Sequence, residues 1–123
     1  MSLRSVTNCW FISAYFLVFL IIVFSLTPSL LIQESIAHIP QGENLSHLVP
    51  YFFLMVFFSK TYSNRIHPVR IGLALTVLGV SIEFLQLLVP DRGFDLNDIL
   101  FNSIGVIMGL LFFWATTRSW SYL

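Results

Sequence analysis

Long, mostly apolar stretches, each near the length needed to cross a bilayer, constrain this chain more than any other feature. A membrane-spanning helix needs about 20 consecutive, mostly apolar residues. Four stretches approach or exceed this length, and short polar segments separate them: residues 10–32, 47–62, 68–89 and 96–117. The sequence therefore predicts an all-α polytopic membrane protein. We expect a four-transmembrane-helix bundle forming a single domain over residues 1–123.

Composition and proline positions support this interpretation. The chain is 57% hydrophobic and 10% charged, whereas soluble domains are roughly a quarter charged. Pro68 suits a helix start because its missing N–H would be unpaired there anyway, and Pro90 suits a helix end. The first stretch is longer than the apolar part of a signal peptide, so we expect it to remain as a helix. The lipid bilayer is thus the expected environment.

The basic residues are distributed unevenly between the two sides of such a bundle. Five of the six share one side: Arg4, Lys60, Arg65, Arg70 and Arg118. The positive-inside rule places that side in the cytoplasm, together with the N and C termini. Arg92 and all the acidic residues then belong to the outer side or to the outer half of a helix.

Polar residues recur at helical spacing at the outer ends of three predicted helices. Spacings of three or four residues place side chains on one helix face. The polar positions are Glu43, His47 and Tyr51; Glu83 and Gln86; Asp98 and Asn102; with Arg92 and Asp95 in the connection before the last helix. A charged group near the bilayer centre costs about 2.5–3.5 kcal/mol, so these residues should face other helices. We predict that they form one outward-facing polar site.

Glycines predict where the helices approach closely. Gly79 lies one turn before Glu83, and Gly105 and Gly109 continue the stripe of Asn102. Small residues let the backbones of membrane helices come together. We expect Gly79 to contact Gly105 and so to bring Glu83 near Asn102. The first helix has no polar stripe and is expected to serve only in packing.

Purely structural roles remain open for several of these residues. Asp95 could cap the fourth helix, with Asp98 completing a capping-box-like start. Glu83 and Gln86 could form a hydrogen-bonded clamp between helices. Asp95 and Asp98 could instead join Glu83 around a divalent cation, since carboxylates are hard oxygen ligands. We regard the cation as the weaker alternative and assign no metal ligand.

Several function classes are not favoured. The net charge is zero and there is no basic run, so nothing indicates nucleic acid as a partner. Cys9 is the single cysteine, which excludes an internal disulfide and a cysteine-based zinc site. Zincin, nucleophile-elbow and Gly-rich phosphate-loop motifs are missing from the sequence. These observations weigh against an enzyme without deciding the matter.

Two segments also resemble a known family. The stretches ENLSHLVPYFFL and EFLQLLVPDRGFDLNDILFNSIGVIMG resemble the VanZ-like family of small bacterial membrane proteins. The family pattern is D-K-x-x-H-x-x-x-Y, E-x-x-Q, R-x-x-D-x-x-D and N-x-x-G-x-x-x-G. The matching residues are His47, Tyr51, Glu83, Gln86, Arg92, Asp95, Asp98, Asn102, Gly105 and Gly109. One departure is that Glu43 and Asn44 replace the acid–lysine pair of the pattern.

The resemblance implies a multi-pass protein of the bacterial inner (cytoplasmic) membrane. The family takes its name from a protein associated with low-level teicoplanin resistance, which links it to glycopeptide susceptibility. Our main hypothesis is a site for an anionic or lipid-linked cell-envelope precursor, with Arg92 holding a phosphate or carboxylate and Glu83 or His47 handling a proton. The alternatives are a small proton-coupled transporter-like module and a structural or partner-docking protein. A homo-oligomer is compatible with each.

Overall fold

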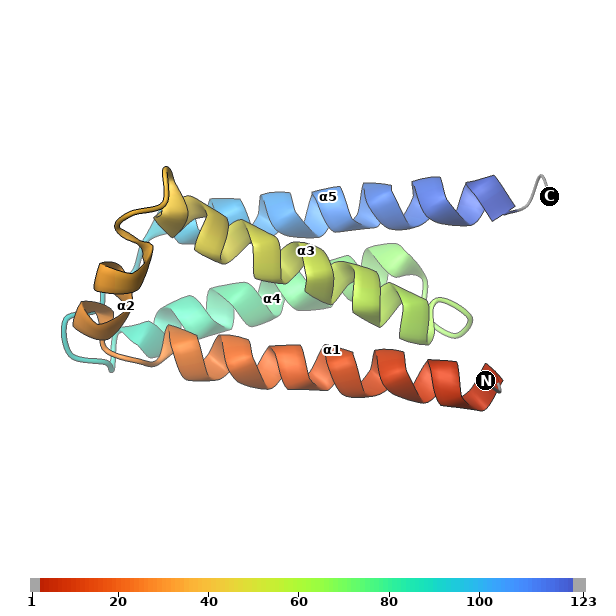
Figure 1. The fold of residues 1–123 in the computed structure, drawn as a ribbon, viewed down its shortest axis with the longest axis horizontal. Helices are drawn as coiled ribbons and strands as arrows, with labels where there is room; N and C mark the ends of the chain where they lie inside the picture. Colours follow the sequence, from red (N-terminus) through yellow and green to blue (C-terminus); the bar gives the residue numbers. More distant parts are fainter. Residues whose placement is uncertain (1–2, 121–123) are drawn as a thin grey trace.

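The computed structural model describes residues 3–120, without the side chains of residues 3–7, 29, 31, 33, 35, 119 and 120. This part of the chain contains helices and no strand, which confirms the all-α prediction. The helices are α1 (Leu3–Ser25), α2 (Ser29–Ile36), α3 (Gly42–Tyr62), α4 (Pro68–Gln86) and α5 (Leu96–Trp120). Four of them are long and run side by side, while the short α2 lies at one end (Figure 1).

Three helices are long and apolar enough to cross a membrane by themselves. They contain the candidate spans Asn8–Ser25 in α1, Pro68–Gln86 in α4 and Leu96–Arg118 in α5. The helix α3 is long enough, at 21 residues, but it is not among these candidate spans. The four-span bundle therefore remains a prediction, whereas the membrane-like character of α1, α4 and α5 is evident.

The structure divides the helix that we predicted over residues 10–32. Helix α1 ends at Ser25, and α2 begins at Ser29. Pro28 explains the break, because proline lacks an N–H and its ring clashes with the carbonyl group four residues earlier. The last bonds of α1 are Leu26 N–H to the Ile22 carbonyl and Thr27 N–H to the Phe24 carbonyl. The apolar stretch thus forms a long helix and a separate short one.

Other boundaries also differ from the prediction, since α1 begins at Leu3 rather than residue 10 and α5 ends at Trp120 rather than residue 117. Helix α3 begins at Gly42 rather than at residue 47, after Gln41 in the left-handed backbone region with a φ of 53°. A carboxylate in its first turn, Glu43, suits the positive end of the helix dipole. Helix α4 ends at Gln86 rather than residue 89, and tight turns then carry the chain through Val89.

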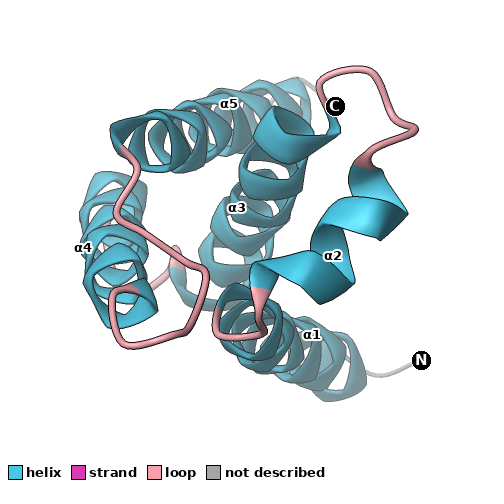
Figure 2. Cartoon of the chain, turned by 90° about the vertical axis from the view of Figure 1, so that its left-hand side faces the viewer, coloured by secondary structure: helices cyan, strands magenta, loops and turns pink. Residues whose placement is uncertain are grey.

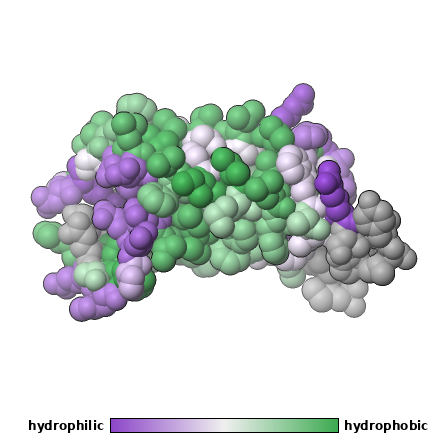
Figure 3. All heavy atoms as spheres, turned by 90° about the horizontal axis from the view of Figure 1, so that it is seen from above, coloured by the Kyte–Doolittle hydropathy of each residue, from purple (hydrophilic) through white to green (hydrophobic). Residues whose placement is uncertain are grey.

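Helix α3 occupies the centre of the packing. It contacts α5 along much of its length and also packs on α1 and α4. Side chains from all four long helices form the core: Ile21, Tyr51, Leu54, Met55, Ile71, Leu75, Ile82 and Val106. Many large apolar side chains on α1, α4 and α5 point outward instead. The face shown in Figure 3 has a hydrophobic band across the middle, with hydrophilic residues toward the two ends.

The helices run up and down, so the connections divide between the two ends. The N-terminal end of α1, the α3–α4 connection and the C-terminal end of α5 lie at one end (Figure 1). Lys60, Arg65, Arg70 and Arg118 belong to these segments. The side chain of Arg4 lies outside the described side chains. The acidic residues belong to the opposite end, which is the separation of charge that the predicted orientation requires.

Glycines in α5 allow α3 to approach closely. A Cβ atom at Gly109 would lie 2.7 Å from the Phe52 carbonyl oxygen, and one at Gly105 would collide with the Leu48 carbonyl oxygen. Gly105 therefore packs against α3, and this corrects the expected contact with Gly79 of α4. The close α3–α5 contact leaves no space for even one methyl group at these positions.

We predict that Gly105→Ala lowers the free energy of unfolding. Alanine should gain up to about 1 kcal/mol of helix propensity, but a methyl forced against backbone should cost about 1–3 kcal/mol. Unfolding in detergent micelles, followed by circular dichroism, measures the difference. Gly93→Ala is the control because an added Cβ there meets nothing within 4 Å. Equal stability of the two variants would contradict the close contact.

Candidate functional site

A cavity of about 890 Å³ lies at the end of the molecule that carries α2. Its lining comes from α1, α2, the first turns of α3, the end of α4, the α4–α5 connection and the start of α5. Figure 2 views this end and shows α2 between the end of α1 and the start of α3. Helix α2, which we did not predict, therefore supplies part of the wall.

One wall of the cavity is apolar. Helix α1 contributes four of its side chains to this wall at helical spacing, α2 contributes two isoleucines one turn apart, and α3 adds a valine and a proline. These residues are Leu17, Leu20, Ile21, Phe24, Ile32, Ile36, Val49 and Pro50. The prediction that α1 serves only in packing therefore misses its place in this wall.

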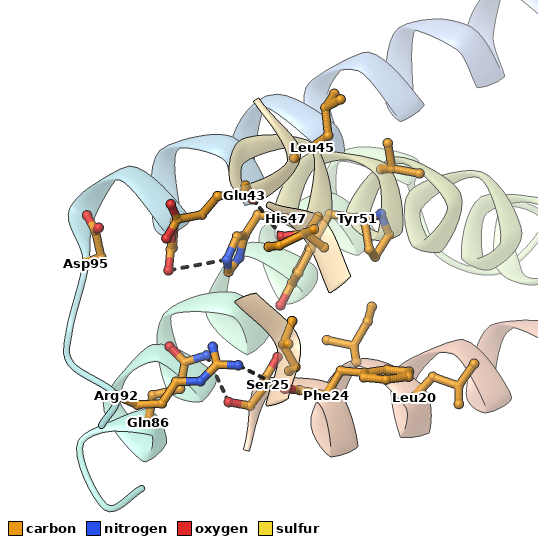
Figure 4. Close-up of a pocket in the computed structure, with 18 of the residues that line it drawn as sticks. Leu20, Phe24, Ser25, Glu43, Leu45, His47, Tyr51, Gln86, Arg92 and Asp95 are labelled. Atoms are coloured by element: carbon orange, nitrogen blue, oxygen red, sulfur yellow. Dashed lines mark hydrogen bonds and ion pairs between the residues drawn. The ribbon is translucent and has the colours of Figure 1, made fainter. Parts of the chain in front are cut away.

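Most of the predicted site residues line the rest of the cavity and are polar. They come from α3, the end of α4, the α4–α5 connection and the start of α5 (Figure 4). They are Glu43, His47, Tyr51, Gln86, Arg92, Asp95 and Asp98. Glu83 and Asn102 do not line the cavity. The polar positions predicted on three helices thus lie close together in the structure. Most of them face the cavity, whereas Glu83 and Asn102 lie behind it.

His47 and Asp98 link α3 to α5. The distance from His47 Nε2 to Asp98 Oδ2 is 3.3 Å, and both side chains are largely buried. The negative charges of Asp95 and Glu43 also act on Asp98. At the start of α5, several carboxylates therefore lie within electrostatic range of one another, of the His47 imidazole and of the Arg92 guanidinium.

Glu83 of α4 caps the N-terminal end of the neighbouring helix α5. Its Oε1 accepts a hydrogen bond of 2.8 Å from the backbone N–H of Asp95. Asp95 Oδ1 in turn accepts from the N–H of Asn97, also at 2.8 Å. In a capping box, the acid three residues into the helix would bind the first of these N–H groups. Glu83 takes that place from α4, and Asp98 is paired with His47.

Gln86 and Arg92 cap the broken end of α1. Gln86 Nε2 donates to the Ser25 carbonyl at 3.1 Å. Arg92 Nε donates to the Thr27 carbonyl at 3.0 Å, and its Nη2 donates to the Phe24 carbonyl at 3.2 Å. The last carbonyl groups of a helix lack partners within it, and a positive charge is favourable at that end. Figure 4 shows both side chains reaching toward α1.

Two polar atoms behind the cavity have no partner among the described residues. They are the hydroxyl of Tyr51 and Oδ1 of Asn102, and both side chains are at most 5% exposed. A Cβ atom at Gly79 would lie 3.2 Å from both the Tyr51 hydroxyl and Asn102 Nδ2. Gly79 therefore leaves space in α4 for side chains from α3 and α5.

The carboxylates do not form a metal site in the part of the chain that the structure describes. No group of three or more His, Cys, Asp or Glu side chains there could hold a metal ion. Glu83 bonds to backbone on one side of the α5 start, while Asp98 pairs with His47. The divalent-cation alternative for Glu83, Asp95 and Asp98 therefore finds no support in the geometry.

Comparison with known proteins identifies one family. The model of the VanZ/LLP1 family matches residues 4–117, which is almost the whole chain. No curated protein and no solved structure matches the chain.

We predict that Arg92→Ala loosens the end of α1. The variant loses two charge-assisted hydrogen bonds to helix carbonyls, each worth about 1.5–3 kcal/mol. We expect a lower unfolding midpoint in detergent and faster hydrogen exchange in the segment around Pro28. Arg70→Ala, which removes an exposed arginine at the far end, is the matched control. Unchanged exchange near Pro28 in Arg92→Ala would show that the cap does not hold α1.

Proposed function

The chain belongs to the VanZ/LLP1 family, and on this premise we propose that it binds an amphipathic membrane lipid in the cavity between α1, α2 and α3. The lipid chain would lie along the apolar wall, and the head group would face the polar side. A lipid-linked component of the cell envelope has this chemistry. The proposal concerns binding, and it assigns no catalytic step.

The two-sided lining of the cavity is the observation that carries this proposal. Ligand pockets have volumes of about 300–1,000 Å³ and combine an apolar lining with a few polar groups, and this cavity falls within that range. The apolar wall comes mainly from α1 and α2, whereas the polar groups come from α3, the end of α4, the α4–α5 connection and α5. A ligand with an apolar and a polar part fits both halves, whereas a fully polar solute would leave one wall unused.

A four-span topology would place this cavity at the outer surface of the membrane. Helix α3 would be the fourth span; it packs on α1, α4 and α5, and its Tyr51 and Ser59 side chains are buried. The basic segments Lys60–Arg70 and Arg118 would then lie in the cytoplasm with both termini. We propose a location in the bacterial inner membrane, with the head-group end of the cavity facing outward.

The contacts of Glu83 favour a structural role over the proton-handling role that the binding-site hypothesis gives it. Its carboxylate bonds to the backbone of Asp95 at a helix start. That contact suits a structural link between α4 and α5. A structural role for Glu83 is compatible with a binding role for the cavity, because the two use different residues.

We predict that Leu20→Trp, which fills the cavity from α1, reduces the lipid that remains bound after purification. Native mass spectrometry of the protein released from micelles counts bound lipid molecules. Phe19→Trp is the matched control, since Phe19 is 60% exposed on the outer side of the same helix. In cells, Leu20→Trp should also change glycopeptide susceptibility while Phe19→Trp should not. Equal lipid retention in both variants would rule out binding in this cavity.

We predict an outward position for the α4–α5 connection. In a Cys9→Ser background, a membrane-impermeant maleimide should label Gly93→Cys in intact cells. Asn64→Cys, which is exposed in the α3–α4 connection, should react only after the membrane is opened. The reverse labelling pattern would invert the topology, and labelling of both positions from one side would exclude α4 as a span.

A further inference from the structure

We propose that a cleft between α1 and the end of α3 binds an anionic phospholipid, with Arg65 holding the phosphate. The cleft has a volume of about 410 Å³, and it is lined by Phe11, Thr61, Tyr62, Asn64 and Arg65. These residues belong to the end of the molecule that holds the α3–α4 connection, opposite the end that holds α2 (Figure 1). The inference therefore concerns a second site and does not rest on the proposed function.

The charges at this end of the molecule are positive in the part that the structure describes. Its basic residues are Lys60, Arg65, Arg70 and Arg118. The six acidic residues of the sequence belong to α2, the start of α3, the last turn of α4, the α4–α5 connection and the start of α5. An ammonium group would thus meet no carboxylate among the described residues of this end. The charge balance favours a head group with a net negative charge.

Arg65 has a guanidinium group that the described part of the protein does not use. Its backbone N–H donates to the Tyr62 carbonyl at 2.8 Å, which fixes the residue in the turn after α3. Its exposed side chain makes no hydrogen bond or ion pair with another described residue, whereas the Lys60 ammonium lies 5.6 Å from the centroid of the Phe113 ring. A guanidinium has planar N–H donors that match phosphate oxygens. Arg65, with the Asn64 amide next to it, can therefore bind a phosphate.

The aromatic wall of the cleft suits the interfacial part of a lipid. Phe11 lies in the candidate span Asn8–Ser25 and is 47% exposed. Its ring centroid is 4.8 Å from that of Tyr15, and the hydroxyls of Tyr15 and Tyr62 are hydrogen-bonded at 3.0 Å. Tyrosine is enriched where membrane helices meet the head-group region. A lipid with its phosphate at Arg65 would therefore lay its glycerol and upper chain against Phe11.

The position of the cleft favours a phospholipid over a soluble phosphate. A single exposed arginine binds a free anion weakly, because water and salt screen its charge. An anionic membrane surface, in contrast, attracts each basic residue that lies close to it. Phe11 adds an apolar contact that a soluble anion would leave unused.

Lipid competition in detergent tests the proposal. The purified protein is incubated with equal amounts of phosphatidylglycerol and phosphatidylcholine with identical chains, and native mass spectrometry measures each bound lipid. We expect phosphatidylglycerol to exceed phosphatidylcholine by about fivefold, the attraction expected for one arginine at an anionic surface. Equal binding of the two lipids would overturn the proposal. Displacement of phosphatidylglycerol by excess inorganic phosphate would identify a plain anion site and would overturn the choice of a lipid.

Two arginine variants assign the preference to the cleft. Arg65→Gln should lower the ratio of phosphatidylglycerol to phosphatidylcholine about fivefold. Arg70→Gln removes the same charge from an exposed position of α4 that does not line the cleft, and it should lower the ratio by less than about twofold. Equal effects would show that the charge of the whole end attracts the lipid, which would overturn the cleft as the site.

The unfolding midpoint separates lipid binding from a structural role of Arg65. Measured by circular dichroism in detergent without added lipid, Arg65→Gln should unfold at the same midpoint as the unchanged protein, because its side chain bonds to no described residue. A lower midpoint for Arg65→Gln would assign Arg65 to folding and count against the proposal.

A variant of the aromatic wall tests the apolar part of the site. Phe11→Ala should lower the amount of bound phosphatidylglycerol about threefold, because the lipid loses apolar contact. Phe19→Ala is the matched control, since Phe19 is exposed on the same helix and does not line the cleft. Equal binding in the two variants would exclude Phe11 from the site.

The Leu20→Trp variant separates the two lipid sites. It fills the cavity at the α2 end and leaves the cleft unchanged, so the preference for phosphatidylglycerol should persist in it. Loss of the preference in Leu20→Trp would place the anionic lipid in that cavity and overturn the second site, while the proposed function would stand.

Discussion

The carbonyl groups at the end of α1 need hydrogen-bond donors, and much of the site depends on how they obtain them. Pro28 ends the helix inside an apolar stretch, where carbonyl groups at the helix end, such as those of Ser25 and Thr27, need donors from outside the helix. Gln86 and Arg92 supply donors from the end of α4 and the following connection. These bonds hold α1 beside α4, and the face of α1 next to them forms the apolar wall of the cavity. Arg92 is thereby largely committed to the protein itself.

A second set of hydrogen bonds caps the start of α5, and it gives the acidic residues two different roles. Glu83 takes the N–H group that an acid of the same helix could have bound, so Asp98 pairs with His47 of α3. Glu83 is 1% exposed and links α4 to α5, whereas Asp95 and Asp98 also border the cavity. Acidic residues that look equivalent in the sequence therefore have different roles. The buried carboxylate behind the cavity joins two helices, whereas those at the cavity edge also face the cavity.

Much of this arrangement was predictable because helix periodicity and proline chemistry are local. Pro68 marks the start of α4, the start of α5 falls at Leu96, and the polar stripes of α3, α4 and α5 meet at one end. The break at Pro28 was missed because the surrounding apolar residues made a continuous helix seem sufficient. The partner of Gly105 and the bonds of Arg92 could not be predicted. Both contact backbone carbonyl groups of another helix, and every residue type has such a group, so the sequence does not mark the partner.

The central position of α3 has a consequence for the insertion of the chain into a bilayer. Its neighbours α1, α4 and α5 each have a stretch apolar enough to partition into lipid alone, and α3 does not. In the proposed topology, α3 would leave the translocation machinery with Glu43, Pro50 and Lys60 unshielded. Its most extensive contact is with α5, the last helix to be synthesised. In that topology, stable integration of α3 would have to wait until α5 has emerged, and biogenesis of the protein would be cooperative rather than helix by helix.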